Sequence, residues 1–239
     1  MIELAASDPA IAAVSPKICS LEERNRFEYA GAAGGFIDRF GYPFCRGRIL
    51  STIEEDRGQY DSTREVFWAS GACLLVKAAV FHELGGFDAA FFAHMEEIDL
   101  CWRAQLKGYK IMVCTESSVY HLGGGTLPNN TPRKIYLNYR NNLSMLYKNL
   151  PESKLEWVLF LRMILDGMSA IIFLLQGRPL FAGAVWSAYR DYNRRKGELA
   201  AMRADIQLSA KHRPKHIYRH SILLRYFLGK KTFGGLKYR

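Results

Sequence analysis

The sequence predicts an α/β chain in which strands alternate with short helices over the first 150 residues and further helices follow. Two observations indicate this class. Apolar runs with the spacing of strands recur at 10–18, 66–77 and 109–121, and segments with helical spacing, 78–84 and 95–107, lie among them. With 239 residues, of which 49% are hydrophobic, the chain can bury a sizeable core.

The first segment reads as the end of a helix, up to Ala6, followed by a turn at 7–9 and then the first strand. A chain that opens at the end of a helix is expected to have lost what preceded it. Residues 19–62 are polar, rich in glycine and aromatic side chains, and have no sustained period. We predict a long ordered loop or a short hairpin there, able to line a pocket.

The central stretch carries the clearest local signals, because glycines stand where each predicted helix should end. The elements expected in it are, in order, strands 66–70 and 72–77 joined at Gly71, a helix 78–84 ended by Gly85 and Gly86, a tight turn at Asp88, a helix 95–107 ended by Gly108, and strands 109–114 and 118–121.

Three carboxylates, Glu96, Glu97 and Asp99, stand at the start of the second of these helices. Glu97 projects about 160° from the apolar face centred on Trp102, which is the ordinary place for an exposed first-turn acid that complements the helix dipole. Asp99 precedes Arg103 by one turn, so a helical ion pair and a direct role are both open. Acids at a helix start with a histidine downstream are also typical of acid/base or metal sites.

That histidine, His121, closes the last predicted strand directly before the glycine run 123–125. A lone histidine is usually structural, but beside glycines the backbone can approach a ligand closely. The glycine run fits neither the P-loop nor the dinucleotide fingerprint, so alone it is weak evidence for phosphate binding.

The basic charge of the chain belongs to its second part. Residues 1–150 hold 16 Lys and Arg against 17 Asp and Glu, whereas residues 151–239 hold 17 against 6, and no acid follows Asp205. Between 217 and 228 apolar and basic residues are interleaved, which suits an anionic membrane surface. Nucleic acid is the competing partner, but no nucleic-acid motif is present and the first part is not basic, so we predict none.

The apolar run 155–175 is the other feature of this part. Arg162 and Asp166 interrupt it at mid-length, where a clean membrane span carries no charge. An interfacial or re-entrant helix is therefore preferred, with a true span and a helix packed on the domain as alternatives. The five cysteines form no CxxC pair and no signal peptide is recognised, so a cytoplasmic setting is expected.

An ordered set of motifs carries a resemblance: WASGACLLVK, GGFD, FFAHMEEIDLCWR, GYK, VYHLGGGT and YLNYRNNL. In this order they resemble the second half of a family 2 glycosyltransferase of the GT-A fold, of the bacterial rhamnosyltransferase-like kind. The resemblance covers residues 8–150. It implies an incomplete, Rossmann-like GT-A domain over 1–150, its acceptor-side half, followed by a helical, basic, membrane-associated tail over 151–239.

The resemblance also implies roles for individual residues. In that family an acidic motif at a helix start supplies the general base of inverting transfer; the base falls on Glu97 here, with Glu96 and Asp99 as the other acids. Glu97 stands in place of the usual aspartate, which lengthens its reach by one methylene. His121 is implied as a ligand of a divalent metal, Mg²⁺ or Mn²⁺. The implied substrate-binding residues are Trp68, Gly71, Asp88 and Arg140, the last of which would face the donor diphosphate.

Enzymes of that family begin with a half that binds the nucleotide and ends in an Asp-x-Asp metal motif, which is not recognised in this sequence. We therefore expect a truncated chain with little or no activity by itself. The implied partners are a nucleotide-sugar donor, a glycan or polyprenyl-linked acceptor and the inner face of the plasma membrane, in cell-surface polysaccharide synthesis. The alternative is a non-catalytic membrane- or partner-binding remnant of such an enzyme.

Overall fold

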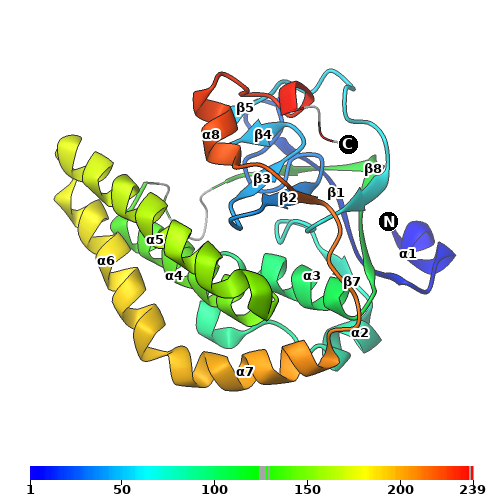
Figure 1. Ribbon diagram of the computed structural model, residues 1–239. Helices are drawn as coiled ribbons and strands as arrows, with labels where there is room; N and C mark the ends of the chain where they lie inside the picture. The colour runs from blue at the N-terminus through cyan, green and yellow to red at the C-terminus, as the bar shows by residue number, and fades with distance from the viewer. Residues whose placement is uncertain (124–127, 129, 237, 239) are drawn as a thin grey trace. The chain divides into compact units, whose positions relative to one another are not determined.

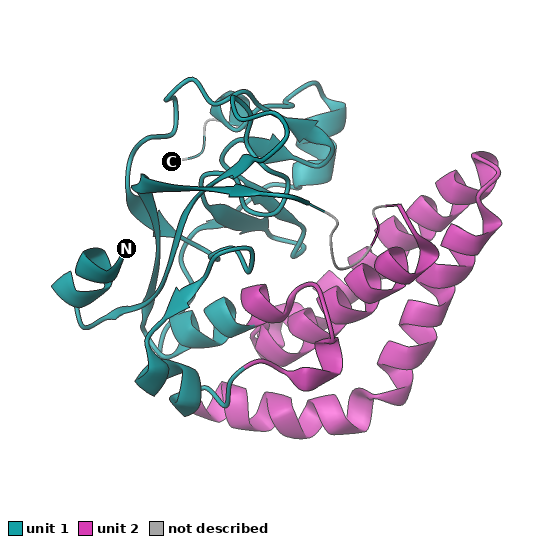
Figure 2. Ribbon diagram, turned by 180° about the vertical axis from the view of Figure 1, so that it is seen from behind, with its two compact units in different colours: residues 1–86, 100–123, 211–239 teal, residues 87–99, 124–210 magenta. Residues whose placement is uncertain are grey.

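The computed structural model describes residues 1–123, 128, 130–236 and 238 (Figure 1). It divides into two compact units, coloured separately in Figure 2. Unit 1 comprises 1–86, 100–123 and 211–239, and unit 2 comprises 87–99 and 124–210. The boundaries of these compact units differ from the predicted domain boundary after residue 150. That domain boundary was inferred from the family resemblance and stays a prediction.

Unit 1 contains a four-stranded sheet in the order β6-β8-β1-β7. β1 (Ile11–Ser20) pairs in parallel with β8 (Lys110–His121), while β7 (Leu75–Val76) and β6 (Arg64–Val66) pair antiparallel at the two edges. β1 is buried over almost its whole length, as expected for a central strand covered on both faces. The two strands predicted at 109–114 and 118–121 form one strand, because a register shift opposite Pro16 accommodates the residues between them.

A second sheet of unit 1 arises from the stretch predicted as a loop or short hairpin. Its order is β5-β4-β3-β2-β9, from β5 (Thr52–Ile53), β4 (Arg48–Ile49), β3 (Pro43–Cys45), β2 (Gly35–Asp38) and β9 (Ile217–Tyr218). The first four strands are successive antiparallel pairs, so the hairpin part of the prediction is confirmed, whereas β9 joins in parallel from the far end of the chain.

The end of the chain packs into unit 1 through aromatic side chains. The rings of Phe233 and Tyr238 lie 5.3 and 4.8 Å from that of Phe36, and Tyr218 and Ile222 are buried. The expectation that the apolar residues of this segment face a membrane is therefore wrong for Tyr218 and Ile222, because the short strands of the second sheet leave an aromatic core that these side chains complete.

The remaining helices of unit 1 match their predicted limits closely. α1 (Ile2–Ser7) precedes β1, and α2 (Ala78–Glu83) ends where Gly85 and Gly86 take positive φ values of 74° and 70°. α3 (Glu96–Leu106) begins in unit 2 and contributes its later turns to unit 1, where Trp102 packs edge-on against Phe67 at 5.3 Å. Two short helices, α8 (Ile222–Phe227) and η2 (Gly234–Leu236), complete this unit.

Unit 2 is helical beyond its first segment, which holds η1 (Ala89–Phe91). α4 (Pro132–Asn149) contacts each of the other three helices, α5 (Glu152–Leu175), α6 (Pro179–Arg194) and α7 (Lys196–Ser209). The Thr131 hydroxyl caps α4 by accepting the amide of Lys134 at 3.3 Å, and prolines occupy the first turns of α4 and α6. Leu143, Tyr192 and Leu199 form the buried centre of this packing.

The two charges that interrupt the apolar run of α5 face inward. Arg162 pairs with Asp166 at 3.1 Å and donates to the side-chain oxygen of Asn142 on α4, and the Tyr189 hydroxyl of α6 donates to Asp166 at 2.8 Å. Both charged side chains are buried within unit 2. From Phe160 onward, the exposed side of α5 is apolar: Phe160, Met163, Ile164, Met168, Ile171, Ile172, Leu174 and Leu175.

Candidate active site

The segment that leads into α3 is held in a strained conformation. Phe92, His94 and Met95 have φ values of 62°, 69° and 74°, a region that residues with a Cβ rarely occupy. The buried amide of Asn141 on α4 fixes this segment by donating to the carbonyls of Phe91, Ala93 and His94 at 2.8–2.9 Å. Strain of this kind concentrates at functional sites, where the surrounding structure holds it in place.

Replacing Asn141 by alanine should therefore destabilise the chain by about 1–3 kcal/mol, because three carbonyls lose one common donor. The free energy of unfolding, measured by urea titration, checks this value. Asn138→Ala is the matched control on the same helix, since among the described residues its side-chain amide donates only to the carbonyl of Lys134 one turn earlier. Equal losses for the two variants would contradict the assigned role of Asn141.

Arg140, the implied donor-diphosphate ligand, contacts the same segment. Its guanidinium donates to the carbonyls of Ala90 and Phe91 at 2.7 and 3.2 Å, to the side chain of Asn141 and to the hydroxyl of Tyr136. These bonds give Arg140 a positioning role in the described structure. Phosphate binding by Arg140 stays a prediction.

A buried ion cluster fixes both ends of this segment to α4. The ammonium of Lys148 lies 2.7 Å from Asp88 and 3.1 Å from Asp99, and Asn149 donates to the other oxygen of Asp99 at 2.8 Å. Asp88 also caps η1 by accepting the amide of Ala90 at 3.0 Å. Burial acts to raise the pKa of the Asp88 carboxyl, but the charge and hydrogen bond of Lys148 outweigh it, so this pKa is lowered.

Glu96 and Glu97 begin α3 directly after the strained segment. Each has one carboxylate oxygen that is shielded from solvent and accepts no hydrogen bond from the part of the chain that the structure describes. Burial raises the pKa of both carboxyls, and burial together with the neighbouring charge of Glu96 raises that of Glu97 to about 8. The interpretation of Glu97 as an exposed first-turn acid is wrong, because a helical projection takes no account of the segments that cover the start of α3.

Such a carboxyl has the property that a general base requires. A pKa close to the working pH keeps a substantial ionised fraction while making that fraction a stronger base than an exposed glutamate. Asp99 differs from the two glutamates, since both of its oxygens are bound by Lys148 and Asn149. Within unit 2 the acids of the motif therefore differ in kind. Glu96 and Glu97 are two carboxyls with raised pKa values, whereas Asp99 anchors the helix through its hydrogen bonds.

The other predicted site residues belong to unit 1. His121 ends β8, and its Nδ1 lies 3.5 Å from the carboxylate of Glu28, which also accepts the amide of Ala30. Glu28 lies in the polar stretch without a period, so nothing in its sequence context singled it out. Trp68 is buried, donates its indole N–H to the carbonyl of Phe36 at 3.0 Å and covers Gly35, whereas Gly71 lies in an exposed turn.

His121 and Glu28 are the two neighbouring side chains that could bind a divalent metal. Among the residues that the structure describes, no group of three or more His, Cys, Asp or Glu could hold a metal ion. A two-ligand pair falls short of the set that Mg²⁺ or Mn²⁺ prefers, so no chemical step below depends on a metal. The proximity of Glu97 to His121 also stays a prediction, as do the substrate-binding roles of Trp68 and Gly71.

Comparison with known proteins supports the resemblance seen in the motifs. An N-acetylglucosaminyl-diphospho-decaprenol L-rhamnosyltransferase of Mycobacterium tuberculosis is 40% identical over 79 residues, 33% of this chain. This chain is similar to glycosyltransferases. A second glycosyltransferase, the rhamnosyltransferase WbbL of Escherichia coli, is 39% identical over 90 residues, 38% of this chain.

A longer match extends to an archaeal glycosyltransferase. The low-salt glycan biosynthesis hexosyltransferase Agl10 of Haloferax volcanii is 23% identical over 161 residues, 63% of this chain. The matches span 26% of the mycobacterial glycosyltransferase, 33% of the Escherichia coli one and 50% of the archaeal one. No family model matches the chain.

Proposed function

We propose that this protein is an inverting glycosyltransferase that moves a sugar from a nucleotide-sugar donor to a glycan or lipid-linked acceptor in cell-surface polysaccharide synthesis. The observation that carries the proposal is the half-buried Glu97 at the start of α3, which has one carboxylate oxygen shielded from solvent and a pKa raised to about 8. The names of three similar proteins, two rhamnosyltransferases and a hexosyltransferase, support the same reaction class.

In this proposal Glu97 takes the proton of the acceptor hydroxyl as the acceptor oxygen forms its bond to the anomeric carbon of the donor. The bond from that carbon to the nucleoside diphosphate breaks on the opposite side, and the diphosphate leaves with the bonding electrons. The configuration at the anomeric carbon is thereby inverted. Glu96 raises the basicity of Glu97 through its charge, while Asp99 and Asp88, held by Lys148, keep the start of α3 in position.

The expectation of weak or absent activity belongs to this proposal. We expect little or no turnover of a nucleotide sugar by the 239-residue chain. A chain of this length that transfers sugar would refute the expected inactivity while supporting the reaction.

The reaction class is tested by deleting the gene in its own organism. We expect the surface glycan or its lipid-linked precursor to lose a sugar, as measured by mass spectrometry, and the wild-type gene to restore it. An unchanged glycan would favour the alternative, a non-catalytic membrane- or partner-binding remnant.

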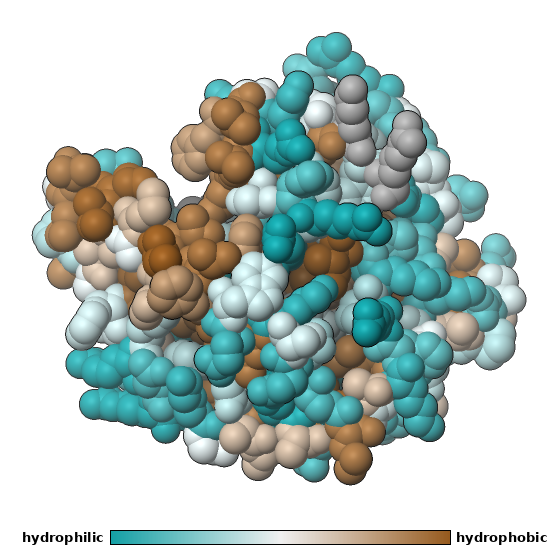
Figure 3. All heavy atoms as spheres, in the orientation of Figure 1, coloured by the Kyte–Doolittle hydropathy of each residue, from teal (hydrophilic) through white to brown (hydrophobic). Residues whose placement is uncertain are grey.

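We place the reaction at the inner face of the plasma membrane. In the part of the chain that the structure describes, α5 alone is long and apolar enough to cross a membrane, and only 17% of its most apolar 18-residue window is buried. Apolar residues gather over α5 and α6 in Figure 3. Because Arg162 and Asp166 face α4 and α6, an interfacial position with the outer face of α5 in the bilayer keeps these two charges away from lipid.

Ile171→Asp should lower the partition of the protein into lipid vesicles at least tenfold, because a carboxylate on the outer face of α5 opposes insertion. Sedimentation with vesicles measures the effect. Leu208→Asp on α7 is the matched control, since Leu208 is also apolar and 89% exposed but lies outside α5. Equal partition of the Ile171 variant and the wild type would exclude α5 as the contact.

A further inference from the structure

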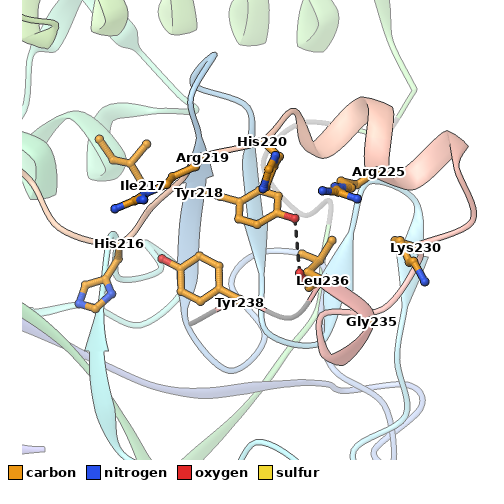
Figure 4. Close-up of a pocket in the computed structure, with 10 residues that line it drawn as sticks. All are labelled: His216, Ile217, Tyr218, Arg219, His220, Arg225, Lys230, Gly235, Leu236 and Tyr238. Carbon is orange, nitrogen blue, oxygen red and sulfur yellow. Dashed lines mark hydrogen bonds between the residues drawn. The ribbon is translucent and has the colours of Figure 1, made fainter.

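Unit 1 contains a pocket of about 750 Å³ formed by the C-terminal segment that starts at β9 (Figure 4). Its volume is in the range of pockets that hold small organic ligands. The side chains that matter for its chemistry are Tyr218, Arg219, His220, Arg225, Lys230 and Tyr238.

The lining of this pocket is basic. Arg219, Arg225 and Lys230 carry positive charge, and none of the described residues that line the pocket is an Asp or Glu; the chain has no Asp or Glu after Asp205. Throughout the described residues, no carboxylate forms an ion pair with any of these three cations. In Figure 4 the Arg225 guanidinium points toward Tyr218 and His220, whereas Arg219 extends to the other side of the pocket.

The wall that carries Arg225 is fixed to the sheet. The buried carboxylate of Asp38 accepts the amide of Ile222 at 2.8 Å at the start of α8. On the same helix the Tyr226 hydroxyl lies 3.1 Å from Ser51 and 3.0 Å from Thr52. Arg225 therefore projects from an anchored helix, and such preorganisation lowers the entropy that a ligand must overcome on binding.

An apolar surface adjoins this basic pocket. Leu224, Phe227 and Leu228 are 61%, 76% and 65% exposed, and Figure 3 shows an apolar patch over α8. An exposed apolar patch beside two guanidinium groups without an ion pair in the described part of the chain matches the chemistry of a lipid, in which acyl chains adjoin an anionic head group.

We propose that this pocket binds the phosphate group of an anionic lipid, with the exposed apolar residues of α8 against its acyl chains. A guanidinium suits phosphate because its N–H donors match two phosphate oxygens at once. The aromatic rings of Tyr218 and Tyr238 and the imidazole of His220 surround the same space with apolar faces and further hydrogen-bonding groups. The site is independent of the proposed sugar transfer.

The test compares the affinity of the 239-residue chain for vesicles of phosphatidylcholine with and without phosphatidic acid. The ratio of the two affinities cancels the apolar contribution of α5, which is the same for both kinds of vesicle. Arg225→Gln/Lys230→Gln should lower this ratio about 30-fold, whereas Lys211→Gln/Arg213→Gln, which removes the same charge outside the pocket, should change it less than about threefold. An equal decrease of this affinity ratio for the two double variants would mean that any positive charge on the chain has the same effect. That result would contradict a specific phosphate site in the pocket.

A second experiment distinguishes a lipid ligand of the pocket from a soluble phosphate ligand. Calorimetric titration with inorganic pyrophosphate measures soluble binding by the same variants. A decrease in pyrophosphate binding for Arg225→Gln/Lys230→Gln with an unchanged vesicle ratio would assign the pocket to a soluble ligand and overturn the lipid. If this double variant fails to fold, Lys230→Gln alone repeats both arms, since the Lys230 side chain is exposed.

Discussion

Glu97→Gln is expected to lower sugar transfer between about 10²- and 10⁴-fold, the range typical of a lost general base. Glutamine keeps the size of the side chain and removes only its ability to accept the proton of the acceptor hydroxyl. The rate of transfer is compared in strains that lack the gene and carry either the wild type or the variant, from the incorporation of sugar into the surface glycan or its lipid-linked precursor. Glu116→Gln, an exposed acid on β8, is the control and should retain full activity. A loss of less than about threefold for Glu97→Gln would remove Glu97 from the mechanism.

The raised pKa of Glu97 adds two dependences on pH. Transfer should increase as the pH rises through about 8, because only the ionised carboxylate accepts a proton.

The stability of the folded chain should change with pH in the opposite sense. The folded pKa is above the ordinary value of 4.5, so the stabilisation from burying a neutral carboxyl is complete below that value, is lost as the pH rises above it, and is gone once the pH passes about 8. The Tm of Glu97→Gln, minus that of the wild type, should therefore increase between pH 5 and pH 9.

Lys148→Met is expected to destabilise the chain by about 3–5 kcal/mol, because it leaves the buried carboxylates of Asp88 and Asp99 without their common cation. For a chain of this size that corresponds to a decrease in Tm of roughly 6–20 °C, measurable by calorimetry. Methionine has nearly the volume of the lysine stem, so the loss reports on charge and not on packing.

The control for this variant is Lys154→Met, which removes an exposed lysine near the start of α5 and should leave Tm within about 2 °C. Adding Asp88→Asn and Asp99→Asn to Lys148→Met should recover part of the stability, because the uncompensated charges are then removed. No recovery would mean that the lysine stem, and not its charge, holds the cluster together.

The sequence predicted the elements whose signals are local. The glycines after α2 and α3 and the 3,4 spacing around Trp102 placed both helices within one or two residues of their observed limits. The motif acids at the start of α3 were also correctly located. These predictions needed no information from outside a window of about a dozen residues.

The remaining features depend on contacts distant in the sequence. Strands of two to four residues, such as β4 and β5, are too short to show a period, and β9 pairs with β2 from across most of the chain. Lys148 meets its two carboxylate partners over separations of 60 and 49 residues. No periodicity predicts such pairs, and the same limitation hid the partial burial of Glu97 and the contact of His121 with Glu28.

The inward ion pair of α5 has a practical consequence for biochemistry. Because Arg162 and Asp166 are satisfied by neighbours inside the helical bundle, the outer residues of α5 can be exchanged for polar ones without exposing a charge or opening the interior. A variant redesigned in this way should be produced and purified without detergent, while the segment before α3 keeps its shape.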